Sequence, residues 1–339
     1  MIENEISIID AFPGFNEIKL AEFRINYLLE VVDKVIIAES KITHSGYGKP
    51  LYFSQWISNQ SYAIRERVVV VEVPLSHLKT SWEREIFTRE SLLAFLTTHY
   101  PRARYIISDL DEIPSISQVL NFCRSSGVFH FNTPTSYRRI NWLLKDSHAS
   151  WARGVMGDAS LRNHPNVGRF IKFPLIKGHP GAHLSYLGKG HIALQEKIGA
   201  FAHTELNASI YNSPSLVSYC DKFRIDHLGR SQELGTGLLE IDECLSNEVL
   251  IASKEYFPEY FDQGIGLPSL LSRLYASIRL TSYLSQGIIG KIQRKLFTPE
   301  YFFSHKNPLV QVGGLLYIFL ISLRKTGYSL LKSKFERRI

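Results

Sequence analysis

The chain has 339 residues and a mass of 38.8 kDa, and 45% of its residues are hydrophobic while 21% are charged. These proportions are typical of a globular protein with a sizeable core, and they exclude wholesale disorder, collagen and coiled coil. The three cysteines, Cys123, Cys220 and Cys244, form no CxxC pair and are odd in number. Neither a disulfide framework nor a zinc site is therefore expected.

The net charge of +7 is concentrated near the C-terminal end. Residues 291–339 contain ten Lys and Arg against two acidic residues, so they carry +8 and the preceding 290 residues sum to −1. A basic body that binds nucleic acid is therefore not expected. The first twelve residues contain no basic n-region and no long apolar h-region, which predicts a cytoplasmic protein without a signal peptide or N-terminal anchor.

Apolar runs and helical periodicity alternate in the first part of the chain. The runs predict strands over 6–12, 34–38, 68–73 and 104–108. The periodicity predicts helices over 16–32, 55–62 and 82–99, and another that starts at residue 115. A strand, a helix and a strand in succession form a βαβ unit, so we expect a mainly parallel, Rossmann-like sheet with helices on both faces.

Local signals refine these elements. Asn16 and Ser81 are the expected N-caps of the helices that follow them. Ser115 and Gln118 fit a capping box at the start of the next helix. The continuous valine run within 68–73 predicts a strand that is buried on both faces.

From residue 128 the pattern changes to strands and loops, with strands predicted over 128–132, 136–143 and 151–156. We interpret this as an acceptor half, over 128–290, that completes a site begun by a nucleotide-binding half over 1–127. The two halves form one α/β domain over 1–290, followed by a basic, partly apolar helical segment over 291–339. Ligands of open α/β sheets bind beyond the carboxyl ends of the strands, which indicates residues 10–16, 39–49 and 109–114.

The segment from Ser108 to Pro114 is the strongest local signal of chemistry. In an extended segment, Asp109 and Asp111 present two carboxylates to one spot while Leu110 points into the core. Such a pair suits Mg²⁺ or Mn²⁺, which prefers oxygen ligands and can neutralise a departing nucleoside diphosphate. Acidic residues after a strand can also simply cap the next helix or face water.

Several separated segments resemble glycosyltransferase family 17, the β-1,4-mannosyl-glycoprotein β-1,4-N-acetylglucosaminyltransferase family. The matching segments are 10–17 with Arg24, 32–40, 48–51, 82–89, 107–114 and 200–205. The resemblance implies a GT-A-like fold and inverting, metal-dependent transfer from a sugar nucleotide, which is UDP-N-acetylglucosamine in the best-known members. The acceptor expected from it is a glycan, either a surface polysaccharide or a lipid-linked oligosaccharide. Animal members carry an N-terminal anchor, so the sequence predicts a bacterial-type member.

The resemblance and the strand-end positions together indicate residues that bind the sugar nucleotide. They are Phe12, Asn16, Glu39, Ser40, Lys49, Arg84, Arg89 and Asp109. Ordinary turn polarity is the competing explanation for Glu39, Ser40 and Lys49. Arg84 and Arg89 could instead form surface ion pairs with neighbouring glutamates, and the resemblance favours Arg89 for the pyrophosphate.

The expected metal ligands are Asp109, Asp111 and His203. An inverting transferase also needs a carboxylate that takes the proton from the acceptor hydroxyl, and the candidates are Glu205, Asp158 and Glu112. One departure from the family pattern is Ala182, which stands before His183 where a Trp is expected. Its small side chain removes a large aromatic platform and bears on the identity of the acceptor or the donor sugar.

Two other functions compete with glycosyl transfer. A non-catalytic, membrane-associated glycan-binding or assembly protein could keep the fold, but the intact Asp109 and Asp111 argue against it. A metal-dependent phosphohydrolase would need a second carboxylate cluster, which the sequence does not offer.

The apolar run 309–323 has fifteen residues, fewer than the about 20 that span a bilayer as a helix. It could be a buried helix with a solvated basic end. The basic residues interleaved with apolar ones after it favour an amphipathic segment on an anionic leaflet. We therefore expect peripheral association with the cytoplasmic face of the membrane through residues 291–339.

Overall fold

A computed structural model describes most of the first two thirds of the chain. The described residues are 7–144, 154–163, 171–188, 190–202, 213–227, 239–242, 245, 247–263, 272, 273, 276 and 280. The chain forms two compact units, one made of 1–208 with 240–265 and the other of 209–239 with 266–339. The predicted boundary at residue 290 and the whole of the segment 291–339 lie outside the described residues.

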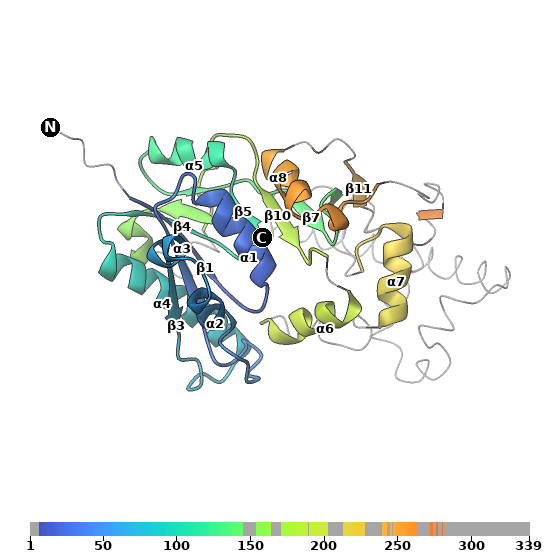
Figure 1. The fold of residues 1–339 in the computed structure, drawn as a ribbon, viewed down its shortest axis with the longest axis horizontal. Coiled ribbons are helices and arrows are strands. Elements are labelled where there is room, and N and C mark those ends of the chain that lie inside the picture. Colours follow the sequence, from blue (N-terminus) through green and yellow to red (C-terminus); the bar gives the residue numbers. More distant parts are fainter. Residues whose placement is uncertain are drawn as a thin grey trace, which may run out of the picture. The chain divides into compact units, whose positions relative to one another are not determined.

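A six-stranded sheet forms the centre of the first unit (Figure 1). Its strand order is β3-β2-β1-β4-β9-β6. The strands are β1 (Ile8–Pro13), β2 (Lys34–Glu39), β3 (Val68–Glu72), β4 (Arg104–Ile107), β6 (Phe129–His130) and β9 (Val155–Gly157). Strands β1 to β4 are parallel, and β9 pairs antiparallel with both β4 and β6. The predicted mainly parallel α/β sheet is confirmed.

Strand β3 is an edge strand, contrary to the expectation of burial on both faces. Only Val68 is buried, whereas Val69, Val70 and Val71 are half-buried. A run of β-branched residues indicates a strand, but it does not indicate the strand's position in the sheet. The physical reason is that, among the described strands, β3 pairs with β2 alone, so none of them covers its outer side.

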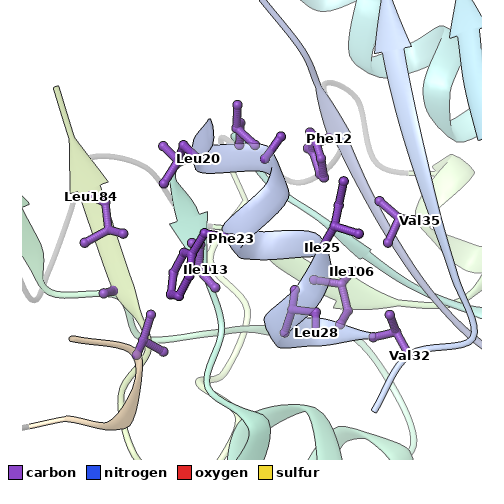
Figure 2. Close-up of a cluster of buried hydrophobic side chains, with 14 of the residues drawn as sticks. Phe12, Leu20, Phe23, Ile25, Leu28, Val32, Val35, Ile106, Ile113 and Leu184 are labelled. Carbon is purple, nitrogen blue, oxygen red and sulfur yellow. The ribbon is translucent and has the colours of Figure 1, made fainter. Parts of the chain in front are cut away.

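Helices cover both faces of this sheet. Helix α1 (Ile18–Leu28) packs with α2 (Tyr52–Ser58) and α3 (Tyr62–Arg67) on one face, and α4 (Ser81–His99) packs on the other. The alternation along β1 explains the two layers, because Ile8 and Phe12 face α1 while Ile9 and Ala11 face α4. Figure 2 shows Leu20, Phe23, Ile25 and Leu28 of α1 projecting into the first of these cores.

A second sheet of five strands has the order β11-β8-β7-β10-β5. Its strands are β5 (Glu112–Ile113), β7 (Thr135–Tyr137), β8 (Trp142–Leu144), β10 (Ala182–Ser185) and β11 (Leu239–Ile241). The predicted strand over 136–143 is thus two strands, joined where Arg138 adopts a positive φ of 64°. Strand β5 belongs to this sheet, while β6 and β9 complete the first one, so the two predicted halves interleave.

The remaining helices of the first unit are short. They are α5 (Ile116–Cys123), α6 (His191–Ala200) and α8 (Glu248–Tyr256), with 3₁₀ turns at Ala159–Asn163 and Pro258–Tyr260. In the second unit, α7 (Pro214–Phe223) packs Leu216 and Cys220 with Ile225, Ala276 and Leu280. None of the helices among the described residues combines the length and the apolar character needed to cross a membrane.

The helix starts confirm one predicted cap and correct two. Ser115 and Gln118 form the predicted capping box at α5. Helix α4 begins one residue earlier than predicted, and its cap is Thr80, whose hydroxyl accepts from the Glu83 N–H while the Glu83 carboxylate accepts from the Thr80 N–H. Asn16 does not cap α1, because the residue at the cap position is Glu17. The Glu17 side chain makes no cap bond and instead accepts from the Lys197 ammonium.

Candidate functional site

The strand order predicts a ligand-binding position between β1 and β4. Strand β1 lies between β2 and β4. From β1 the chain first builds β2 and β3 on one side, and it then returns to add β4 on the other side of β1. In such a doubly wound sheet, ligands bind at the carboxyl ends of the strands where the order reverses. Residues 14–17 follow β1 and residues 108–111 follow β4, so both loops lie at this edge.

Arg24 of α1 is fully buried at this edge, and it donates hydrogen bonds to Asp10 in β1 and to the loop after β4. Its Nε and Nη2 atoms donate to the two carboxylate oxygens of Asp10, at 2.8 and 2.6 Å. Nη2 also donates to Ser108 Oγ, at 2.8 Å. Below it lies the buried ring of Phe12, whose centroid is 4.6 Å from the guanidinium carbon. A guanidinium is the side chain best suited to such a site because its donors form a rigid planar fork.

The same guanidinium folds the acidic segment into a turn. Nη1 donates to the carbonyl oxygens of Asp109, Leu110 and Glu112, at 2.7, 3.1 and 3.0 Å. The N–H of Glu112 closes the turn by donating to the Asp109 carbonyl, at 3.0 Å. Residues 109–112 are therefore not extended, and the prediction that Asp109 and Asp111 point to one spot is wrong. A turn reverses the chain direction, which sends the two carboxylates to different partners.

Asp109 faces the solvent side of the turn. Its carboxylate pairs with the buried guanidinium of Arg89, which also lies 3.7 Å from Glu85. The side chain of Asp109 is 29% exposed. Arg89 thus holds a carboxylate of the acidic turn, and its predicted contact with the pyrophosphate stays a prediction. The Asp109 carboxylate is therefore both fixed in position by Arg89 and accessible from solvent.

Asp111 lies in the protein interior beneath the turn. Its Oδ2 accepts from the Lys197 ammonium at 2.8 Å, and its Oδ1 lies 3.5 Å from Nε2 of His183. Lys197 also donates to Glu17 Oε1 at 2.6 Å. Burial alone would raise the pKa of Asp111, but Lys197 and His183 outweigh it and hold that pKa below its usual range.

The two cationic partners respond in the opposite sense. Burial alone would lower the pKa of Lys197, but Asp111 and Glu17 raise it above its ordinary value. Burial would likewise lower the pKa of His183, and Asp111 raises it. Each group of this cluster therefore depends on its neighbours for its charge state, as is common at functional sites.

The described residues do not fit the expected divalent-metal site. Both oxygens of Asp111 face protein cations, and Asp109 faces Arg89. Within the part of the chain that the structure describes, no three His, Cys, Asp or Glu side chains converge to hold a metal ion. The third predicted ligand, His203, lies outside the described residues.

The loop after β2 contains the next group of predicted donor-binding residues. Glu39 is fully buried, and its carboxylate accepts from the N–H groups of Phe53 and Ser54 at the start of α2. The Lys49 ammonium lies 3.7 Å from Glu39. Burial lowers the pKa of Lys49, and the Glu39 carboxylate partly opposes that shift. Glu39 therefore anchors the helix and orients Lys49.

Three other residues predicted to bind the sugar nucleotide, Arg84, Phe12 and Asn16, differ in what surrounds them. Arg84 donates to the carbonyls of His44, Leu78 and Lys79, so it holds the loop after β2. Phe12 lies in the core against Arg24. Both side chains are fully buried, so neither Phe12 nor Arg24 is placed to touch a ligand directly. Asn16 precedes Glu17 in the loop after β1, and its Oδ1 is buried without a hydrogen-bond partner among the described residues.

Ser40 and Ala182 have contrasting positions. Ser40 lies at the carboxyl end of β2, and its hydroxyl accepts from the Ile42 N–H at 3.4 Å. Ala182 is fully buried in β10, opposite Ile113. The side chain at position 182 therefore belongs to the hydrophobic core, and an aromatic platform for a sugar is not what this position presents.

The three candidate bases have different positions. Glu112 is buried at the turn, and its Oε2 accepts from the Asp109 N–H at 3.1 Å. Asp158 follows β9 next to the amino end of β4, where its Oδ1 accepts from the Ser160 N–H. It is thus separated from the acidic turn by the length of β4, about 10 Å. Glu205 lies outside the described residues.

The sequence interpretation missed the partners that organise this site. Arg24 and Glu17 lie within the segments that carry the resemblance, but no spacing pattern connects them with residues 108–112. His183 and Lys197 follow Asp111 by 72 and 86 residues in the chain. A lone Lys in a helix has no sequence signal that distinguishes it from a surface residue.

Comparison with known proteins supplies the remaining evidence. The sequence profile of glycosyltransferase family 17 matches residues 2–216, a range that includes Glu17, Asp111, His183 and Lys197. The chain is 30% identical over 121 residues to the β-1,4-mannosyl-glycoprotein 4-β-N-acetylglucosaminyltransferase of Homo sapiens, covering 33% of this chain and 23% of that protein. The Rattus norvegicus protein of the same name is also 30% identical over 121 residues, covering 33% and 22%. The matched stretch spans less than a quarter of each relative, whereas the family profile spans well over half of this chain. The chain therefore belongs to glycosyltransferase family 17.

Proposed function

We propose that the protein is an inverting glycosyltransferase with a GT-A-like fold, which transfers N-acetylglucosamine from UDP-N-acetylglucosamine to a glycan acceptor. The observation that carries the proposal is the acidic turn at the carboxyl ends of β1 and β4, with Asp109 fixed by Arg89 and accessible from solvent. The choice of N-acetylglucosamine is supported by the names of the human and rat relatives, which are N-acetylglucosaminyltransferases.

The donor nucleotide binds over the acidic turn in this proposal. The carboxylate of Asp109 accepts hydrogen bonds from hydroxyl groups of the ribose, a role that suits two fixed oxygens on an exposed edge. The buried Oδ1 of Asn16 accepts from a further donor group of the nucleotide. Ser40 and Lys49 follow β2 at the same edge and meet the diphosphate with a hydroxyl and a positive charge.

The reaction is a single displacement at the anomeric carbon. The acceptor hydroxyl attacks that carbon from the face opposite the diphosphate, the bond between the anomeric carbon and the diphosphate oxygen breaks, and a carboxylate takes the hydroxyl proton. We assign the carboxylate to Glu205, with Glu112 as the alternative at the turn. Asp158 is the least suited of the three, because it lies at the amino end of β4.

The acceptor is a surface polysaccharide or a lipid-linked oligosaccharide in this proposal. The basic segment 291–339 brings the enzyme to an anionic membrane surface, where such acceptors are made. This segment lies outside the described residues, so the support comes from its charge and its apolar residues alone.

Calorimetric titration with UDP-N-acetylglucosamine, UDP-glucose, UDP-galactose and GDP-mannose tests the proposal. We expect saturable binding of the first, weaker binding of the other UDP-sugars and none of GDP-mannose. Asp109→Asn should weaken UDP binding about 10- to 100-fold, the range for losing hydrogen bonds to a charged acceptor. Asp158→Asn makes the same chemical change at the other end of β4 and should bind as wild type. Equal affinity of Asp109→Asn and wild type for UDP would refute the assigned site.

A further inference from the structure

The buried ammonium of Lys197 joins two carboxylates, one from the loop after β1 and one from the loop after β4. Glu17 follows β1, Asp111 follows β4, and Lys197 reaches both from α6. The Lys197 Nζ lies 2.6 Å from Glu17 Oε1 and 2.8 Å from Asp111 Oδ2. The side chain of Lys197 is only 3% exposed, so this is an interior ion cluster.

Two aromatic rings also lie near the ammonium. Its Nζ lies 5.1 Å from the ring centre of Tyr186 and 5.2 Å from that of Phe201, within the range of a cation–π contact. His183 stands on the far side of Asp111, with Nε2 3.5 Å from Oδ1. The contacts of Lys197 and Asp111 therefore place an ammonium between two carboxylates, with an imidazole on one of them.

The two groups that flank Nζ are carboxylates, and His183 contacts only the far oxygen of Asp111. Carboxylate oxygens are ordinary ligands of Mn²⁺, and two carboxylates carry the charge of −2 that such an ion would balance. In this chain a lysine already lies between the carboxylates and neutralises half of that charge. A divalent cation placed there would meet the positive charge of Lys197 at contact distance, which is strongly unfavourable in the interior.

We propose that Lys197 is a built-in cation, whose ammonium occupies the cation position between Glu17 and Asp111 and makes a divalent metal at Asp111 unnecessary. Lys197 is a positioning residue in this role, because it acts through the two carboxylates and holds the loops after β1 and β4 together. The cluster is stable only with a cation in it, since removing one partner leaves a buried charge uncompensated.

Titration of the wild-type protein with MnCl₂ is the first test, with free Mn²⁺ measured by electron paramagnetic resonance. The proposal expects no stoichiometric uptake of Mn²⁺, and a midpoint of thermal unfolding that Mn²⁺ and EDTA leave within about 1 °C of each other. Uptake of one equivalent of Mn²⁺ by wild type that Asp111→Asn abolishes would overturn it. This test uses no variant of Lys197, so it decides the matter even if such a variant does not fold.

The second test removes the built-in cation. Lys197→Ala should lower the unfolding midpoint, and saturating Mn²⁺ should raise the midpoint of this variant by about 5 °C or more. The double variant Lys197→Ala/Asp111→Asn should lose that response. Lys41→Ala is the matched control, because Lys41 also pairs with a glutamate, Glu72, at 2.8 Å but is 68% exposed. A folded Lys197→Ala protein that takes up no more Mn²⁺ than Lys41→Ala would overturn the proposal.

A third measurement connects the inference with the proposed function, on which this arm rests. Transfer from UDP-N-acetylglucosamine by the wild-type protein should proceed at the same rate in EDTA and in Mn²⁺. A rate that falls at least tenfold in EDTA would overturn the built-in cation while leaving the transferase intact. Absence of transfer under both conditions would count against the proposed function, and the Mn²⁺ titrations would still decide the role of Lys197.

Discussion

The guanidinium of Arg24 and the carboxylate of Asp10 form a two-pronged ion pair in which both side chains are fully buried. Asp10 lies in β1 and Arg24 lies two turns into α1, so the pair ties the first helix to the central strand. The three donor contacts of Arg24 with the carbonyls of residues 109–112 extend this tie to the acidic turn. The geometry of the site at β4 is therefore set by a residue of α1.

Replacing Arg24 by Lys should damage both stability and donor binding. Lysine keeps the positive charge, but it has no planar fork and cannot hold Asp10 together with three carbonyls. We expect the free energy of unfolding to fall by about 2 to 3 kcal/mol, the range for lost hydrogen bonds to charged groups. UDP affinity should fall at least about tenfold, measured by calorimetry under conditions where the variant is folded.

The control for this prediction is Arg104→Lys. Arg104 is also buried, and it donates to the carbonyls of Phe122 and Ser125, on the side of the sheet where β4 begins. This variant should lose stability by a similar mechanism but keep wild-type affinity for UDP. If Arg24→Lys also keeps wild-type affinity, the turn does not depend on Arg24 for its shape.

The general base can be identified by comparing three amide variants. Glu205→Gln should leave UDP binding intact and reduce transfer by at least about 100-fold, because the lost proton acceptor acts only in the transition state. Asp158→Asn should transfer sugar at the wild-type rate, since Asp158 lies at the amino end of β4. Glu112→Gln should weaken donor binding through the turn, because the Glu112 carboxylate holds the Asp109 N–H. Normal transfer by Glu205→Gln would move the assignment to Glu112.

The cap of α4 should make a small contribution to stability that depends on pH. The N–H groups of Thr80 and Lys79 donate to the Glu83 carboxylate and hold its pKa below the ordinary value of 4.5. A depressed pKa adds stability above pH 4.5, and that stability is lost as the pH falls through the pKa of the folded state. Wild type should therefore melt higher than Glu83→Gln at pH 7, by at most about 2 °C, and the difference should disappear in acid.

Glu90→Gln is a suitable control for the cap. Glu90 is exposed on the same helix and lies outside its first turn. Its replacement should leave the unfolding midpoint nearly unchanged at both pH values. A difference between wild type and Glu83→Gln that is the same at pH 7 and at pH 3.5 would show that the carboxylate charge has no part in the cap.

The basic segment 291–339 should bind anionic membranes. The full-length protein should float with vesicles that contain acidic lipid, and raising the salt from 0.1 to 0.5 M should weaken the binding about tenfold or more, because screening shortens the reach of the charges. Truncation after Pro308 should abolish flotation without lowering UDP affinity. If full-length protein ignores acidic vesicles, or if truncation unfolds it, the segment is part of the folded core.

Some features of this protein follow from short stretches of its sequence. The βαβ start, the parallel strands and the Ser115 cap were predictable because each depends on neighbouring residues, through periodicity or a hydrogen bond within four residues. The edge position of β3 was not, because burial on its outer side depends on whether another strand pairs there.

The site was predictable only in part. The order of the strands and the acidic loop after β4 predicted that the loops after β1 and β4 meet at one edge of the sheet, since the carboxyl ends of parallel strands lie together. The orientation of Asp109 and Asp111 was not predictable, because the turn is held by Arg24, a residue 85 positions before Asp109.

The sequence by itself determined that this chain is an α/β protein of glycosyltransferase family 17 with an acidic loop at the end of its fourth strand. Only the tertiary structure decided which charges meet there. Asp111 and Lys197 are 86 residues apart in the chain, and they pair because α6 packs where the loops after β1 and β4 converge. Coulomb attraction depends on distance in space and on burial, and neither quantity is encoded in a local pattern of residues.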